Sequence, residues 1–240
     1  MGNDSCFGWG WNADFLFSSF FVRITGGSFV IFELFPVGPF QCNCIILGCE
    51  ETKAAVVIDP GEDASCILQH LAKWELKTLY LLHTHAHIDH IGATDAVRTQ
   101  TGAETALHEE DMFLCQNLAL QASLFDLSCP PVPIIDLFLR HGDIFSFGRH
   151  RVEVLHTPGH TPGSVSFHIP TLGLLTGDTL FKGSIGRTDL WRGSYPALID
   201  SIKTKLLSFP DETVVYPGHG PPTTIGAEKE ENPFVGKDLL

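Results

Sequence analysis

The chain carries four potential metal ligands within six residues, in the stretch Thr84-His85-Ala86-His87-Ile88-Asp89-His90. Imidazole nitrogen and carboxylate oxygen are the ligands of zinc and of borderline or hard transition metals, whereas a soft metal prefers thiolates, which this stretch lacks. The alternative is a solvated loop that is rich in histidine by chance. The density of ligands favours a metal-binding loop.

The expected backbone of this loop explains the spacing of its ligands. Hydrophobic periodicity predicts a strand at residues 77–82 and a helix that begins near residues 90–94. In an extended segment His85 and His87 point the same way and can bind one ion. The turn into the helix then directs Asp89 and His90 toward a second ion. The motif therefore predicts two adjacent metal sites.

The second half of the chain has three further potential ligands, each just past an expected strand. They are His160 in Thr157-Pro-Gly-His-Thr-Pro-Gly163, Asp178 in Thr176-Gly-Asp-Thr179 and His219 in Gly218-His-Gly220. Each lies near a glycine, which lets the backbone turn tightly and approach a metal cluster. Loops at strand ends are also where a rigid scaffold can position catalytic groups.

Strand and helix signals surround these ligands in the same order in both halves of the chain. Two runs of mainly antiparallel strands, each followed by helices, predict an α+β fold, a four-layer αββα sandwich. The expected strands are residues 28–35, 41–47, 54–58, 77–82, 144–147, 152–155, 165–169, 172–175 and 213–216. The expected helices are residues 64–73 with Asp63 as N-cap, one that starts near residues 90–94, and residues 109–124 and 195–207. The tail after Pro221 is polar and is expected at the surface.

The length and composition indicate one globular domain. A chain of 240 residues lies near the upper limit for a single core, and 44% hydrophobic with 18% charged residues excludes disorder. We expect residues 28–240 to form a single domain. Residues 1–27 are an N-terminal extension to which the sequence assigns no role: they resemble neither a secretory signal nor a membrane span.

The net charge and the cysteines limit which classes of binding partner and which cellular compartment fit this chain. The 28 Asp and Glu exceed the 15 Lys and Arg by 13, so the net charge of −13 disfavours nucleic acid and anionic membranes as partners. Seven cysteines without framework spacing indicate a reducing compartment, and we expect the cytoplasm, although the extension leaves an organelle open. Cys42 and Cys44 share a strand face but lack a second cysteine pair, which favours buried packing over metal binding.

At these motifs the sequence resembles the metallo-β-lactamase superfamily, whose signature is an H-x-H-x-D-H loop. The resemblance extends over residues 29–234. Five phrases are similar to the glyoxalase II-like hydrolases, and most of all to their short, single-domain bacterial group. They are Phe35-Pro-Val-Gly38, Gln41-Cys-Asn-Cys44, Ile58-Asp-Pro-Gly61, Gly177-Asp-Thr-Leu-Phe181 and Gly218-His-Gly-Pro221.

The resemblance implies a pairing of the ligands that the spacing alone does not. One metal would be bound by His85, His87 and His160, the other by Asp89, His90 and His219, with Asp178 bridging them. The expected cofactors are two divalent metal ions, zinc before iron or manganese. Asp59 matches a position that orients a ligand histidine or the loop, and its alternative role is to form the turn before Pro60-Gly61. The other histidines, among them His83, His108 and His156, are expected to pack or to hydrogen-bond.

The same resemblance implies thioester hydrolysis. Two bridged divalent metals lower the pKa of a shared water, so a hydroxide nucleophile forms without a separate base, with Asp89 and Asp178 as catalytic residues that hold it. The implied substrate is a small-molecule thioester, an S-(2-hydroxyacyl)glutathione such as S-lactoylglutathione. Lys182 and Arg187 would bind the glutathione carboxylates, and the alternative for Arg187 is a salt bridge to Asp189 or Asp211.

Departures from the pattern keep other functions open. Full-length glyoxalases II have a helical C-terminal domain that contributes to glutathione binding. They also have aromatic residues near the ligands, at positions where this chain has Asp189, Gly220 and Pro221. The metal chemistry therefore carries over from the resemblance, but the glutathione specificity does not. Persulfide dioxygenases share the fold and use one iron, for which His85, His160 and Asp178 would be the ligands. Lactonase and RNA-processing relatives fit less well, and a non-catalytic metal-binding protein would be expected to have lost a ligand.

Overall fold

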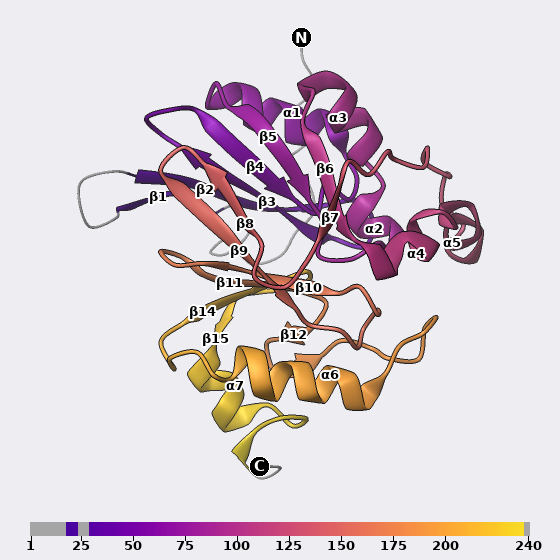
Figure 1. Cartoon of the computed structure of the whole chain (residues 1–240), viewed down its shortest axis with the longest axis vertical. Coiled ribbons are helices and arrows are strands. Elements are labelled where there is room, and N and C mark those ends of the chain that lie inside the picture. The colour runs from indigo at the N-terminus through magenta and orange to yellow at the C-terminus, as the bar shows by residue number, and fades with distance from the viewer. Residues whose placement is uncertain (1–17, 24–28, 238–240) are drawn as a thin grey trace.

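Two β-sheets face each other in the structure, a computed structural model that describes residues 18–23 and 29–237 (Figure 1). The first sheet contains seven strands, whose order across the sheet is the same as their order along the chain. They are β1 (Ser18–Arg23), β2 (Phe29–Val37), β3 (Cys42–Cys49), β4 (Ala54–Ile58), β5 (Lys77–Leu82), β6 (Glu104–His108) and β7 (Leu137–Leu139).

The second sheet has six strands in the order β15-β14-β11-β10-β9-β8. Its strands along the chain are β8 (Ile144–Phe147), β9 (His150–His156), β10 (Val165–Ile169), β11 (Gly173–Gly177), β14 (Val214–Pro217) and β15 (Thr223–Thr224). A separate two-stranded hairpin is formed by β12 (Leu180–Phe181) and β13 (Ser184–Ile185).

Helices cover the outer faces of both sheets (Figure 1). In the first half they are α1 (Ala64–Lys73), α2 (Ile88–Ile91), α3 (Thr94–Thr101), the 3-10 turn η2 (Glu109–Asp111), α4 (Met112–Cys115) and α5 (Leu118–Phe125). In the second half α6 (Tyr195–Ser201) continues into the π-helical segment η3 (Ile202–Leu206), and α7 (Ile225–Glu231) follows β15.

The main hydrophobic core lies between the two sheets. It joins side chains such as Phe32 and Val56 of the first sheet to Phe167 and Val154 of the second, all fully buried. Two further clusters lie between each sheet and its own helices, one around Ile67 of α1 and one around Leu198 of α6. Apolar layers on both faces of both sheets define a four-layer αββα sandwich, which confirms the predicted fold.

The first sheet is mixed, so the expectation of mainly antiparallel strands was wrong for its second half. Strands β1 to β4 pair antiparallel, but β4, β5, β6 and β7 run parallel. The reason is that α1 and α3 are crossover connections, which return the chain to the same end of the sheet before the next strand begins. The parallel strands bring the ends of β4, β5 and β6 to one edge.

Three local expectations differ from the structure. Strand β1 pairs with β2 and lies within residues 1–27, where no element was assigned; the rest of that extension lies outside the described residues. Asp63 precedes α1 but makes no side-chain cap, because its carboxylate accepts a hydrogen bond from Gly38 N (2.9 Å) instead. The tail after Pro221 is not a surface segment, since α7 and Val235 bury apolar side chains.

Helix α1 is attached to the first sheet by a buried carboxylate. Glu33 of β2 is 1% exposed and accepts hydrogen bonds from His70, Lys73 and Trp74. Burial alone raises the pKa of this carboxyl, but the three donors outweigh it and lower the pKa to about 2.

Replacing Glu33 tests this attachment through the pH dependence of stability. Because its folded pKa is lower than the usual 4.5, the stabilisation is complete above about pH 4.5 and is lost as the pH falls toward 2. We expect Glu33→Gln to lower the free energy of unfolding at pH 7 by on the order of 2–3 kcal/mol in urea titrations, with the deficit shrinking below pH 4.5. Glu51, which is exposed and pairs with Arg149, is the control. An equal and pH-independent loss of unfolding free energy in Glu51→Gln would contradict the role assigned to Glu33.

Candidate metal centre

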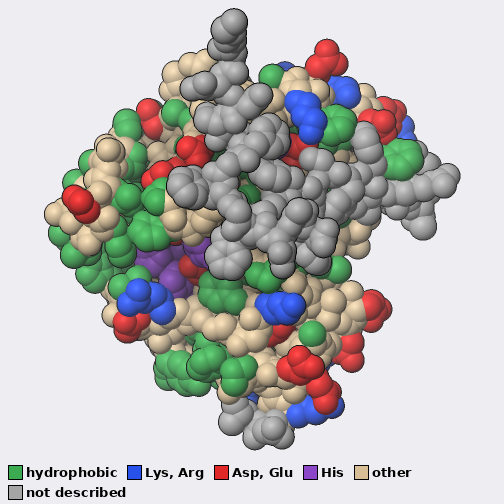
Figure 2. All heavy atoms as spheres, turned by 180° about the vertical axis from the view of Figure 1, so that it is seen from behind, with side chains coloured by type: hydrophobic (Ala, Val, Ile, Leu, Met, Phe, Trp, Pro, Cys, Tyr) green, Lys and Arg blue, Asp and Glu red, His purple; other side chains and the backbone are tan. Residues whose placement is uncertain are grey.

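The seven predicted ligands come from four segments that meet at one edge of the two sheets. His85 and His87 follow β5, and Asp89 and His90 lie on the short helix α2. From the other half, His160 follows β9, Asp178 follows β11 and His219 follows β14. Figure 2 shows histidine side chains together, with acidic groups, in a recess between the two halves. The structure therefore brings the sequence-predicted residues of both halves to one place.

Three imidazoles converge in the first group. His87 Nδ1 lies 3.0 Å from His85 Nε2 and 2.9 Å from His160 Nε2. A single hydrogen cannot satisfy three nitrogens that face one another, whereas nitrogens around a tetrahedral zinc ion lie about 3.3 Å apart. The group His85, His87 and His160 is thus spaced as one set of metal ligands.

The second group combines two imidazoles with a carboxylate. His219 Nε2 lies 3.2 Å from His90 Nε2 and 3.2 Å from Asp89 Oδ2, and the same carboxylate oxygen is 3.7 Å from His90 Nε2. These three atoms are again close enough to share one cation.

Asp178 lies between the groups. Its Oδ2 is 3.6 Å from His160 Nε2, and its Oδ1 is 3.5 Å from His90 Nε2 and 3.7 Å from His219 Nε2. Oδ1 is buried and has no hydrogen-bond partner among the described residues. A buried acceptor without a donor costs free energy, so this oxygen fits a cation as its partner. One oxygen directed at each group is the arrangement of a bridging ligand.

Hydrogen bonds from outside the cluster set the tautomers of its imidazoles. The Nδ1 atoms of His160 and His219 lie 2.8 Å and 3.0 Å from the carbonyl oxygens of Arg187 and Phe40, respectively, and donate to them. His85 Nδ1 lies 3.0 Å from Thr84 Oγ1, and His90 Nδ1 lies 3.0 Å from Asp59 Oδ2. With the proton on Nδ1, each Nε2 directs a lone pair into the cluster, as metal-binding histidines require.

The electrostatics of the two groups differ. Burial lowers the pKa of His85 and His87 well below the usual value, and that of His160 below it, which keeps these rings neutral and able to bind a metal. Burial acts the same way on His90 and His219, but Cys42 and the carboxylates of Asp178 and Asp89 raise the pKa of His90, and the same two carboxylates raise that of His219. A cation is favoured where these carboxylates point, so the donor set fits two divalent metal ions.

Asp59 lies behind the metal loop. Its Oδ1 accepts a hydrogen bond from Thr84 N, and its Oδ2 accepts from Thr84 Oγ1, both at 2.7 Å. The same Oδ2 accepts from His90 Nδ1. The carboxylate is buried and contacts both the metal loop and His90, while the Asp59 backbone has the left-handed φ of 51° at the turn before Pro60-Gly61.

Glycines allow the loops to approach this closely. A Cβ on Gly61 would lie 1.7 Å from the backbone oxygen of Asp89, and one on Gly218 would lie 2.4 Å from Asp178 Oδ1. No side chain fits at either position, because real Cβ contacts do not fall below about 3 Å.

The predicted substrate-binding residues lie at the exposed rim. Arg187 donates two hydrogen bonds to the carboxylate of Asp189, from Nε and from Nη2, both at 2.8 Å. This is the structural alternative that the sequence left open, while its backbone oxygen accepts the hydrogen bond from His160. Lys182 is exposed next to the β12–β13 hairpin.

Sequence reasoning missed two residues that fasten the metal loop. Asp111 is fully buried and accepts hydrogen bonds from Ala86 N (3.0 Å), Thr161 Oγ1 (2.8 Å) and Gly163 N (2.7 Å). Gln121 of α5 accepts from Ile88 N and donates to Ala86 O. No local signal marked Asp111, which ends the acidic run Glu109-Glu110-Asp111 and whose partners lie far away in the sequence.

The remaining polar groups near the centre are structural. Buried His83 contacts Thr94 Oγ1 (2.7 Å) and Ala106 O (3.0 Å), as expected. Cys42 lies 3.4 Å from His90 Nδ1, on the outer side of that ring. Burial raises the pKa of the Cys42 thiol to about 12.

The chain belongs to the metallo-β-lactamase superfamily, because the family model described as "Metallo-beta-lactamase superfamily" matches residues 37–219. It is 42% identical over 212 residues to the hydroxyacylglutathione hydrolase GloC of Haemophilus influenzae, covering 85% of this chain and 97% of that protein. It is therefore similar to a named metallohydrolase over almost that protein's full length.

Solved structures agree in fold. BLEG-1 B3 metallo-β-lactamase is 40% identical with a TM-score of 0.80, covering 86% of this chain and 100% of that one. The di-iron-bound form of TTHA1623 is 40% identical with a TM-score of 0.75, covering 83% and 99%. ETHE1 from Myxococcus xanthus is 33% identical with a TM-score of 0.72, covering 85% and 84%.

Asp111 is expected to control metal affinity without touching a metal. In Asp111→Asn an amide NH2 replaces an oxygen that faces N–H and O–H donors, so the turns that carry His85, His87 and His160 lose their common anchor. We expect the affinity for divalent metal to fall by about 10- to 100-fold, measured by competition with a chelator.

A matched control separates positioning from general destabilisation. Asp136 also accepts a backbone hydrogen bond, from Thr105 N (2.9 Å), but it pairs with Arg98 away from the cluster. Asp136→Asn should lower thermal stability and leave metal affinity unchanged. Equal metal affinity in both variants would overturn the role of Asp111.

Proposed function

We propose that this protein is a binuclear metal-dependent thioester hydrolase that acts on an S-(2-hydroxyacyl)glutathione such as S-lactoylglutathione. The observation that carries the proposal is the convergence of two groups of three potential ligands, with Asp178 oxygens near both. The metals would be bound by His85, His87 and His160 on one side and by Asp89, His90 and His219 on the other.

Hydrogen-bond partners around the cluster orient the imidazole rings for this reaction. Arg187 O, Phe40 O, Thr84 and Asp59 fix the ring directions, so the lone pairs converge without rearrangement. Divalent metal ions bound there supply an activated water at neutral pH and polarise a carbonyl oxygen. Asp89 and Asp178 would accept hydrogen bonds from such a water, since their oxygens face the same imidazoles.

A thioester suits this site because its leaving group needs little assistance. A thiol has a pKa of about 8.5, so it can leave as thiolate without a general acid. Asp89, the carboxylate of the second group, has its pKa lowered below the usual value, because His90 and His219 outweigh the effect of burial, so it does not offer a proton to a leaving group. Ester or amide substrates, whose leaving groups are far more basic, would need such an acid.

The glutathione part of the proposal depends on the exposed rim. Lys182 and Arg187 are the basic residues that follow Asp178, in a chain whose net charge is −13. A glutathione carboxylate can replace Asp189 as the partner of Arg187, because both present the same bidentate acceptor. The similarity to a hydroxyacylglutathione hydrolase supports this substrate class.

Zinc as the metal and the cytoplasm as the compartment belong to the same proposal. The ligands are imidazole and carboxylate, which zinc, iron and manganese all accept. The described cysteines are free, namely Cys42, Cys44, Cys49, Cys66, Cys115 and Cys129, which is consistent with reducing conditions. Among the described residues, no helix is long and apolar enough to cross a membrane.

Metal analysis combined with two activity assays tests the reaction. We expect about two metal ions per chain and hydrolysis of S-lactoylglutathione. The competing function is a mononuclear iron persulfide dioxygenase that would use His85, His160 and Asp178 and leave the second group idle. One iron per chain with oxygen uptake on glutathione persulfide, and no thioester turnover, would replace the proposal by that function.

Asp178→Ala tests the bridging role. Because both groups lose a shared ligand, we expect loss of metal and a fall in kcat/KM of more than about a thousandfold. Asp200→Ala, at an exposed position on α6, is the control and should retain both metals and activity. Full turnover in Asp178→Ala would refute the bridge.

Two variants that each remove one charge test glutathione binding at the rim. If Arg187 binds the substrate, Arg187→Ala raises KM with little change in kcat, whereas Asp189→Ala frees the guanidinium and lowers KM. Both effects should weaken at high ionic strength, because the groups are exposed. If Arg187 acts only through its salt bridge with Asp189, the two variants will change KM in the same direction.

A further inference from the structure

The second group of ligands is open to solvent. The side chains of His219 and Asp89 are 28% and 20% exposed, whereas those of His90 and His160 are almost completely buried. A substrate can therefore reach the metal centre beside His219 and Asp89. The residues that surround this opening are the ones that a bound substrate would contact.

Phe40 lies at this opening because its backbone binds His219. The carbonyl oxygen of Phe40 accepts the hydrogen bond from His219 Nδ1 (3.0 Å), and Cys42, two residues later, forms a β-bridge with His219. Phe40 belongs to the turn between β2 and β3, in which Gln41 donates from both its backbone N and its Nε2 to Gly38 O. The turn thus keeps Phe40 near a metal ligand, although its side chain is 40% exposed.

Phe125 reaches the same opening from helix α5. It lies four residues after Gln121, so the two side chains share one face of the helix. Gln121 is bonded to the metal loop through Ile88 N (3.0 Å) and Ala86 O (3.2 Å), which places Phe125 one helical turn from that attachment. Its ring, which is 43% exposed, meets the ring of Phe40 edge to face, with centroids 5.3 Å apart. These two rings form one surface, the Phe40–Phe125 wall.

The recess has sides of different polarity. Figure 2 shows hydrophobic side chains next to the histidines of the recess. The Phe40–Phe125 wall belongs to the first half of the chain, whereas Lys182 and Arg187 lie on the β12–β13 hairpin and just after it, in the second half. Large apolar groups that are exposed together beside a polar cleft are typical of a ligand-binding surface. The polarity therefore fits a substrate with one anionic end and one apolar end.

We propose that the Phe40–Phe125 wall binds the acyl group of the substrate, and that this group carries an aromatic side chain. The inference rests on the proposed thioester hydrolase function. In a glutathione thioester the carboxylates belong to the thiol part, which the basic side of the recess would take, so the acyl group is directed to the other half. A lactoyl group offers the two rings only a methyl, whereas a phenyl group can pack against both.

Two substrates that differ only in this group test the inference on the metal-loaded protein. S-mandeloylglutathione has a phenyl group where S-lactoylglutathione has a methyl. We expect the native protein to have the higher kcat/KM for the mandeloyl substrate, and Phe125→Ala to lower the ratio of the two values by about tenfold. Phe40→Ala should act in the same direction, because its carbonyl oxygen still binds His219. Phe125→Leu, which retains apolar contact, should restore part of the ratio.

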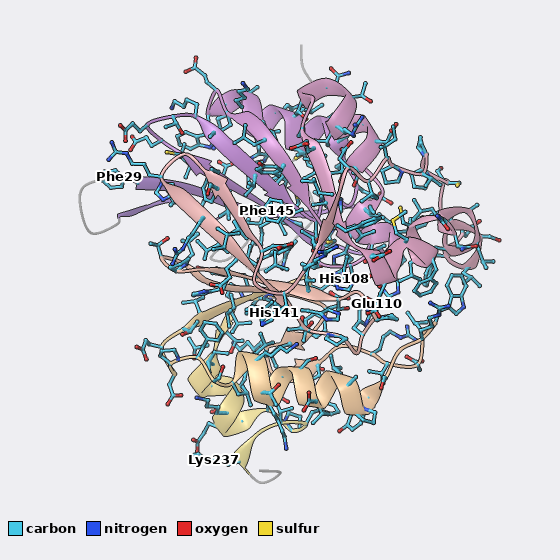
Figure 3. All side chains as sticks on the ribbon, in the orientation of Figure 1. Phe29, His108, Glu110, His141, Phe145 and Lys237 are labelled. Atoms are coloured by element: carbon cyan, nitrogen blue, oxygen red, sulfur yellow. The ribbon has the colours of Figure 1, made fainter. Side chains whose placement is uncertain are left out.

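Phe138→Ala is the matched control. Phe138 is 46% exposed, similar to Phe125, but it lies on β7 and borders a separate cavity of about 300 Å³ whose lining includes none of the seven metal ligands. Figure 3 shows two of the residues that line this cavity, His108 and Glu110, where the two halves meet. The Phe138→Ala variant should keep the native ratio.

Binding of the free product provides a readout besides turnover. In calorimetric titrations mandelate should bind the native protein more tightly than lactate, and Phe125→Ala should remove this difference. If both thioesters are hydrolysed and the ratio is unchanged in Phe125→Ala and Phe40→Ala, or falls equally in Phe138→Ala, the acyl-binding role of the wall is overturned and the proposed function stands. Failure of the native protein to hydrolyse either thioester would overturn the proposed function, and this inference with it.

Discussion

The convergence of imidazole lone pairs on a buried carboxylate is the interaction on which the rest of this structure depends. His85, His90, His160 and His219 each use Nδ1 outside the cluster, which leaves Nε2 directed inward. Asp178 Oδ1 stands among them without a donor from the described residues. Acceptors that face one another are unfavourable by themselves and become favourable when cations bind between them. Other contacts must therefore hold the loops in place against the repulsion between their ligand atoms.

Two buried carboxylates that bind no metal hold those loops from opposite sides. Asp59, at the end of β4, fixes Thr84 and His90. Asp111, at the end of η2, joins Ala86 of the metal loop to Thr161 and Gly163 of the other half. The parallel order of β4, β5 and β6 brings both supports to the same edge, which is why the mixed sheet matters for the site.

Much of the site could be predicted because its signals are local in the sequence. The His-x-His-x-Asp-His spacing depends only on an extended segment that turns into a helix, and α2 begins at Ile88 within that motif. Alternating apolar residues located β2 to β5 with errors of one or two residues. The parallel pairing of β5 with β6 was not predictable in this way, because strand direction depends on which end of the sheet a crossover returns to. Helix α7 was missed because its polar outer face hides the few apolar residues that it buries.

The sequence by itself determined the chemistry: which side chains could bind metal, the two-sheet fold, and the superfamily. Those properties depend on residue type and short-range periodicity, which are complete in the linear chain. Only the tertiary structure decided which way each imidazole faces, and that Arg187 pairs with Asp189. It alone revealed Asp111, and it alone placed His108 against His156. Contacts between residues tens of positions apart are set by the packing of the two sheets, and no local pattern encodes them.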